Sequence, residues 1–283
     1  MFWLIALPFV VEKGWVCPGD QWLWVAPVSD SLAFVVDIHG RLFRCHFPDS
    51  TPELIHDKVI PWGVAAAPDG SMIAFVSDDD KPIVISDDGH LLRRFEVSSK
   101  PGWPVWVDDS TIAFVQDGHL VVGRNSYPGF ENVAHIAHSP ESGLFAFCSR
   151  TGKSLWIFNP ETGLKSEVFA DSLGLFGPAW SQTGRWISVE RLGPGFWILD
   201  AESWQASLVD SGQAGVWWKD YTVFQITHDD GHDITSSKLM IRNTSGQTRV
   251  LLSEGVPVFP KVAGNTVFFL DKGRVGFLRL KER

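Results

Sequence analysis

Residues 67–78 read Ala-Pro-Asp-Gly-Ser-Met-Ile-Ala-Phe-Val-Ser-Asp, which is a polar turn followed by an apolar run. Pro, Asp and Gly adopt the backbone angles of tight turns, and the β-branched and aromatic residues of the run favour a strand. The same pairing of a turn with an apolar tetrad recurs along the chain. The clearest tetrads are residues 32–35, 73–76, 112–115 and 145–148.

Three weaker tetrads, at residues 187–190, 223–226 and 267–270, complete a series of seven. Their spacing varies between 33 and 44 residues along the sequence. A repeat of about forty residues is the length of one four-stranded blade of a β-propeller. The sequence therefore predicts an all-β protein, a propeller with seven blades, with six or eight left open.

The two ends of the chain predict how the ring closes. The last repeat has room for three strands before Arg283, and residues 2–11 are apolar without a repeat of their own. We expect this N-terminal segment to be the outer strand of the last blade, which hides an exposed sheet edge. In the third repeat, Tyr127-Pro128-Gly129 interrupts the outer strand, so we expect three strands or an irregular blade there.

Composition bounds the domain count and the partners. The 283 residues are 45% hydrophobic, and the 26 glycines and 17 prolines are spread without a linker, so we expect one domain over residues 1–283. The net charge of −9 disfavours nucleic acid, which needs a basic surface, and favours a basic protein or peptide partner. The 14 tryptophans stand against only 2 tyrosines.

Compartment signals are sparse. The apolar N-terminus lacks a basic start and a cleavage site, and it is too short to span a bilayer. Cys17, Cys45 and Cys148 are too few for a disulfide scaffold, and we expect them to be small buried hydrophobes. These features favour the cytoplasm, with secretion or a periplasmic location left open.

The second repeat resembles that of the TolB-like, WD-repeat-like propellers, in which a Ser-Pro-Asp-Gly turn leads into Ile-Ala-Phe. Residues 139–147 and 155–163 look like another copy. The resemblance implies a propeller that docks proteins or peptides, and it transfers no catalytic residue because the motif is structural. The Trp-Asp ending of true WD repeats is absent.

One face of such a ring collects the candidate binding residues. In a wound meander, the connections between blades lie on the same side as the loops between second and third strands. On that side we expect the indoles of Trp62 and Trp103 and an acidic set of loops, since loops on a rigid scaffold carry most binding residues. The predicted acidic residues are Asp78, Asp79, Asp80, Asp229 and Asp230. Other tryptophans near inner strands are expected to wedge between blades.

A metal site is a weaker expectation. His228, His232 and Asp233 lie in the polar stretch 228–233, whose side chains can bind Ca²⁺ or another divalent ion. The spacing does not match an EF-hand, and a solvated hairpin loop is the interpretation that we favour for this stretch. We expect no other cofactor.

Three functions fit these features. The first is a non-catalytic propeller scaffold that binds a protein or peptide through its acidic, tryptophan-bearing face. The second is a propeller enzyme of the hydrolase, lyase or lactonase type with a divalent metal at the central pore. The third is a carbohydrate-binding lectin that uses exposed indole faces. The sequence offers no catalytic motif, so the first is the interpretation we carry forward.

Overall fold

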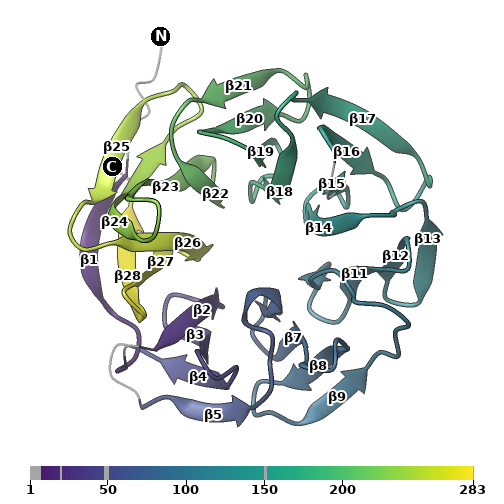
Figure 1. The fold of residues 1–283 in the computed structure, drawn as a ribbon, viewed down its shortest axis with the longest axis horizontal. Helices are drawn as coiled ribbons and strands as arrows, with labels where there is room; N and C mark the ends of the chain where they lie inside the picture. Colours follow the sequence, from purple (N-terminus) through teal and green to yellow (C-terminus); the bar gives the residue numbers. More distant parts are fainter. Residues whose placement is uncertain (1–7, 20, 48–50, 150–151, 283) are drawn as a thin grey trace.

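A computed structural model describes residues 8–19, 21–47, 51–149 and 152–282. Seven four-stranded antiparallel sheets stand side by side in a ring, so the described chain is a seven-bladed β-propeller, as the repeat predicts (Figure 1). Helix is confined here to one short 3-10 turn, η1 (Pro61–Gly63), and no helix of the described residues is long and apolar enough to cross a membrane.

Each blade runs from an inner strand near the ring centre to an outer strand at the rim (Figure 1). The strands of the first four blades are β2 (Trp22–Pro27), β3 (Leu32–Asp37), β4 (Leu42–His46), β5 (Glu53–His56); β6 (Ala65–Ala66), β7 (Met72–Val76), β8 (Pro82–Ser86), β9 (Leu91–Arg94); β10 (Val105–Trp106), β11 (Ile112–Gln116), β12 (His119–Val122), β13 (Asn125–Pro128); β14 (Val133–His138), β15 (Phe145–Ser149), β16 (Ser154–Phe158) and β17 (Lys165–Ala170). Those of the last three are β18 (Leu175–Trp180), β19 (Trp186–Arg191), β20 (Phe196–Asp200), β21 (Ala206–Val209); β22 (Gln213–Trp218), β23 (Tyr221–Asp229), β24 (Ile234–Arg242), β25 (Thr248–Leu252); β26 (Pro257–Ala263), β27 (Thr266–Asp271), β28 (Arg274–Lys281) and β1 (Phe9–Trp15).

The ring closes through the N-terminal strand, which confirms the closure prediction. Strand β1 pairs with β28 as the outer strand of the seventh blade, and the two lie side by side in Figure 1. An ion pair of 2.6 Å between Glu12 and Arg279 adds to the ladder. The strand runs further along the chain than the predicted residues 2–11, of which 2–7 lie outside the described residues.

The third blade differs from its prediction. It has four strands, because β13 forms a ladder with β12 from His119↔Pro128 to Val122↔Asn125, so the expected three-stranded or irregular blade is wrong. Proline is tolerated in an outer strand because the outward side needs no N–H donor. Strand β13 ends after Pro128, and the next residue, Gly129, has a φ of +83°.

The apolar tetrads form the second strand of each blade, and both faces of these strands are buried. Phe34 and Phe75 from neighbouring blades belong to one apolar cluster and have no exposed surface, while Ala33 and Ala74 are equally buried on the opposite faces. Strands covered on both sides read as continuous apolar runs instead of alternating ones. The core of the molecule is therefore a series of apolar layers between adjacent blades.

Candidate functional site

Two cavities open on one face around the ring centre, and we call this face the mouth. The larger has a volume of about 680 Å³ and the smaller about 480 Å³. The larger is lined both by blade-to-blade connections, such as residues 99–103, and by Asp117 and Gly118 between β11 and β12. Both types of loop therefore share one face, as the sequence predicts.

Four exposed aromatic side chains line these cavities, and we call them the mouth aromatics. They come from four different connections or inner strands of the ring. They are Trp62, Trp103, Phe176 and Phe259, with exposed fractions of 40, 38, 36 and 39%. Trp62 lines both cavities, so the two cavities share this indole.

The predicted pair of indoles is held rigidly by neighbouring aromatic rings. Trp62 lies in η1 and meets the ring of Trp24 edge-on at 5.6 Å between centroids and that of Phe259 at 6.2 Å. Trp103 packs on Gly63, where a side-chain Cβ would lie 3.3 Å from the indole, and meets His135 at 4.4 Å. Rigid aromatic groups lose little conformational entropy when they bind a partner.

The larger cavity is lined by the charged side chains of Lys100 and Asp117 and by the imidazole of His135. The carboxylate of Asp117 accepts hydrogen bonds from Ser98 and Gln116, and these bonds lower the pKa of Asp117. Burial lowers the pKa of His135, so this imidazole is neutral near pH 7. The cavity thus combines an ionised carboxylate with a neutral imidazole and two indoles.

The predicted acidic turn Asp78–Asp80 lies between β7 and β8 on the mouth face, but its carboxylates are not equivalent. Asp79 accepts a hydrogen bond from Ser77, which lowers the pKa of Asp79, and it forms an ion pair with Arg94. Asp80 lies 3.6 Å from the ammonium of Lys100. These ion pairs neutralise part of the charge that the sequence places here.

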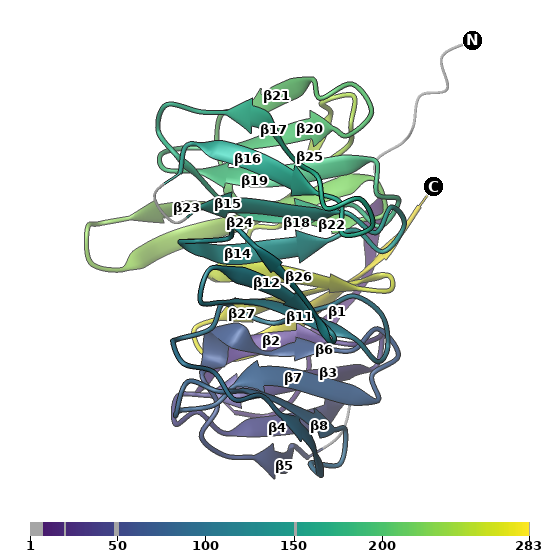
Figure 2. The same cartoon turned by 90° about the vertical axis from the view of Figure 1, so that its right-hand side faces the viewer.

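The stretch 228–233 forms the tip of the β23–β24 hairpin, which extends beyond the other loops of the ring (Figure 2). The Asp230 carboxylate accepts the backbone N–H groups of His232 and Asp233, which lowers the pKa of Asp230. His232, Asp233 and Ile234 line the smaller cavity together with Trp62. Asp229 accepts the N–H of Gly231 at the same tip.

The described structure does not bring His228, His232 and Asp233 together as ligands of one metal ion. Within the described ranges, no group of three His, Cys, Asp or Glu side chains is close enough to hold an ion. All three residues are exposed, on and beside the hairpin tip. The site stays a prediction from sequence.

Several inner-strand tryptophans are structural, as expected. Their indole N–H groups donate to backbone carbonyls of the adjacent blade and so fasten neighbouring inner strands. Trp24 donates to Val64, Trp106 to Ala65 and Trp217 to Ala179. The buried indoles thus explain much of the tryptophan excess, and the exposed mouth indoles need another explanation.

Lys261 was not singled out by the sequence, yet it occupies an unusual position among the inner strands. It reaches from β26 over the Trp24 ring in the first blade, 4.4 Å from the centroid. Burial lowers the pKa of Lys261 to about 8, and the Glu190 carboxylate of the fifth blade opposes this shift.

This lysine gives a pH-dependent stability. The pKa of Lys261 in the folded chain, about 8, lies below the ordinary lysine value of about 10.4, so folding disfavours the charged ammonium. This lowers the stability of the folded chain fully at pH values below 8. Between pH 8 and about pH 10.4, the unfolded chain binds more protons than the folded chain, so the stability of the folded chain rises with pH. Above this range Lys261 is neutral in both states, and the destabilisation is gone. We expect Lys261→Met to raise the free energy of unfolding by about 1–3 kcal/mol at pH 7.

Urea unfolding at pH 7 and pH 10.5 measures this effect. The stability difference between Lys261→Met and the parent chain should shrink toward zero at the higher pH. Lys238→Met, at an exposed position of β24, serves as the control and should show no such trend. A Lys261→Met chain that is less stable than the parent at pH 7 would contradict the expected cost.

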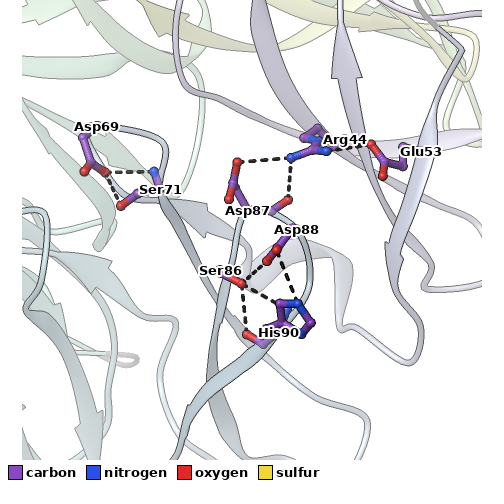
Figure 3. A network of polar contacts seen from close by, with 8 residues as sticks. All are labelled: Arg44, Glu53, Asp69, Ser71, Ser86, Asp87, Asp88 and His90. Carbon is purple, nitrogen blue, oxygen red and sulfur yellow. Dashed lines mark hydrogen bonds and ion pairs between the residues drawn. The ribbon is translucent and has the colours of Figure 1, made fainter.

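The opposite face carries carboxylates with local structural roles (Figure 3). Arg44 of the first blade pairs with Glu53 at 2.8 Å and with Asp87 of the second blade at 3.1 Å. Asp69 caps its own turn by accepting from the N–H and hydroxyl of Ser71. Acidic loops thus occur on both faces, and the clustering of exposed aromatic groups distinguishes the mouth.

A short sequence pattern marks the positions of the four mouth aromatics. Each of the four is followed by Gly or Pro at the entry to an inner strand: Trp62-Gly63, Trp103-Pro104, Phe176-Gly177 and Phe259-Pro260. In two of these strands the pairing shifts at this point, between Phe176 and Ala179 and between Val258 and Lys261. A bulge re-aims a side chain, and here the aromatic ring turns toward the mouth.

No protein-family model matches this sequence, and a search of curated proteins finds no match either.

Proposed function

We propose that this chain is a non-catalytic propeller scaffold that binds a basic peptide, or a basic segment of a protein, at its mouth. The observation that carries the proposal is where the exposed apolar side chains gather. Of the sixteen large apolar side chains that are exposed in the described chain, eight lie on the mouth face. These eight are Ile38, Trp62, Trp103, Leu173, Phe176, Leu192, Ile234 and Phe259.

The other eight have a structural reason to be exposed. Seven belong to outer strands at the rim, and the eighth, Leu164, precedes the outer strand β17. Isolated apolar residues at the surface are normal, whereas a rimmed cluster marks an interaction site. The mouth is therefore the face where a partner would remove the most apolar surface from water.

Charge favours a basic partner over a neutral one. Asp117 beside Trp103 and Asp230 on the overhanging hairpin are both held ionised by hydrogen bonds. A Lys or Arg side chain that pairs with Asp117 would lie in the cavity that Trp62 and Trp103 also line, and a cation over an indole face gains about 0.5–2 kcal/mol. The acidic net charge of −9 would speed the approach of such a partner.

The test uses arrayed synthetic twelve-residue peptides that combine Lys or Arg with one aromatic or aliphatic residue. We expect micromolar binding by a subset, weakened several-fold between 50 and 500 mM NaCl because salt screens exposed charges. Trp62→Ala and Trp103→Ala should each weaken binding about thirtyfold, the effect of losing a central anchor. Fluorescence titration measures both effects.

Trp15→Ala is the matched control, since Trp15 has the same exposure, 39%, but lies on the outer strand β1. It should leave the affinity unchanged, and the melting temperature of each variant shows that it is folded. Equal binding of peptides in which Glu replaces every Lys and Arg would contradict the charge argument. Binding of oligosaccharides in place of peptides would overturn the proposal in favour of a lectin.

A further inference from the structure

Two of the three cysteines meet at the point where the ring closes. Cys17 follows β1 by two residues, and Cys45 lies in β4 of the first blade. The Cys45 thiol forms a hydrogen bond with the Cys17 sulfur, and this contact together with burial raises the pKa of Cys45. Both are reduced and buried, with exposed fractions of 5 and 0%.

The pair lies in the apolar layer between the seventh and the first blade. The same cluster contains Phe268 and Phe277 of the seventh blade and Val35 of the first. The backbone between β1 and Cys17 is fixed, since the N–H of Val16 donates to the carbonyl of Val275 at 2.9 Å. The two thiols are therefore in contact within one buried layer between the blades.

A small cavity reaches Cys17, one member of the pair. Cys17 lines a cavity of about 230 Å³ together with Trp15, Pro18, Gly19 and Arg274. The Arg274 guanidinium lies 3.5 Å from the centroid of the Trp15 ring. The cavity has room for a small oxidant such as hydrogen peroxide but not for a folded partner protein.

We propose that Cys17 and Cys45 are a redox-active dithiol that a peroxide converts to a disulfide across the ring closure. The Cys17 sulfur attacks one peroxide oxygen, the O–O bond breaks, and the leaving hydroxide takes up the proton that the Cys17 thiol loses, which gives a sulfenic acid on Cys17 and one water. The Cys45 sulfur then attacks the Cys17 sulfur as its proton is lost. The S–S bond forms, the S–O bond breaks, and a second water leaves, so two thiols and one peroxide give one disulfide and two waters.

The bond would secure the closing strand. It ties the residue just after β1 to β4, and so joins the seventh blade to the first covalently at their shared layer. The loop that it closes runs from Cys17 to Cys45, and a cross-link over a loop of this length restricts the unfolded chain. The oxidised protein should therefore melt about 5–10 °C above the reduced protein.

The experiment treats the reduced full chain with hydrogen peroxide and follows it by intact mass, peptide mapping and melting. The expected result is the loss of two hydrogens, a Cys17–Cys45 cross-linked peptide, and a rise in melting temperature that dithiothreitol reverses. Cys17→Ser and Cys45→Ser should each abolish the cross-link and the rise.

Cys148→Ser is the matched control. Burial raises the pKa of Cys148 to about 12, and this residue lies in the fourth blade away from the other two. The variant should form the disulfide as the parent does. The proposal is overturned if the folded chain keeps its mass under peroxide that oxidises the urea-unfolded chain, or if Cys17 gains oxygen without a cross-link.

Discussion

A chain that starts at Val16, and so lacks β1, is expected to lose more than about 4 kcal/mol of stability and to unfold without a single sharp transition. Deletion leaves the long strand β28 with an open edge of unpaired backbone groups. It also exposes Leu280, which is 3% exposed in the closed ring, and removes the packing of Val10 on the same cluster. Urea unfolding followed by tryptophan fluorescence measures the loss.

A synthetic peptide of residues 8–15 added in trans tests the cause. It should restore the sharp transition in a concentration-dependent way, because binding to the folded chain alone stabilises it by mass action. Lys13→Ala in the full chain is the mild control. Its ion pair with Glu254 is exposed and worth less than about 1 kcal/mol. A shortened chain that unfolds like the parent would refute closure by β1.

Phe75→Ala is expected to cost about 3–5 kcal/mol, the second-largest effect. The ring of Phe75 has no exposed surface and fills the layer between the first and second blades, where it meets Phe34 and Ile73. Removing it leaves a cavity that the rigid strands on both sides cannot fill by moving together. Denaturant unfolding at pH 7 gives the difference from the parent chain.

Leu91→Ala provides the comparison within the same blade. Leu91 lies in the outer strand β9 with 61% of its surface exposed, so its loss should cost less than about 0.5 kcal/mol. Equal costs for the two substitutions would contradict a core placed between blades.

The fold was predictable because the repeated apolar tetrads reflect how each second strand is packed between two blades. A tetrad such as Ile73–Val76 is apolar at every position since its strand is covered by a blade on each side. The closing strand was predictable from a missing partner in the last repeat. The third blade was mispredicted because Tyr127-Pro128-Gly129 was taken to interrupt the ladder, whereas Pro128 fits the unpaired side of an outer strand.

The site was only partly predictable. Trp62 and Trp103 were expected on this face because of where the connections between blades lie, and the Gly or Pro that follows Phe176 and Phe259 was overlooked as a signal. Contacts between segments that are far apart along the chain leave no mark in a single sequence. The approach of Lys261 to Trp24, and the contact of the two thiols, depend on how the ring brings its ends together.

The acidic character of the mouth was also overestimated from sequence. A count of carboxylates cannot show which ones are engaged by neighbours. Asp79 pairs with Arg94, and the Asp171 carboxylate accepts the indole N–H of Trp197 at 2.6 Å and lies 3.3 Å from Arg191. Asp117 and Asp230 accept hydrogen bonds from neutral groups instead of from Arg or Lys, so these are the carboxylates that we assign to a basic partner.

The central claim, that the mouth is the binding face, is tested most directly by hydrogen–deuterium exchange with and without the tightest-binding basic peptide of the array. We expect slower exchange at residues 60–64, 100–104, 229–234 and 256–260, with no change at residues 86–92 on the opposite face. Protection confined to residues 86–92 or to the outer strands, with the mouth unchanged, would contradict the account.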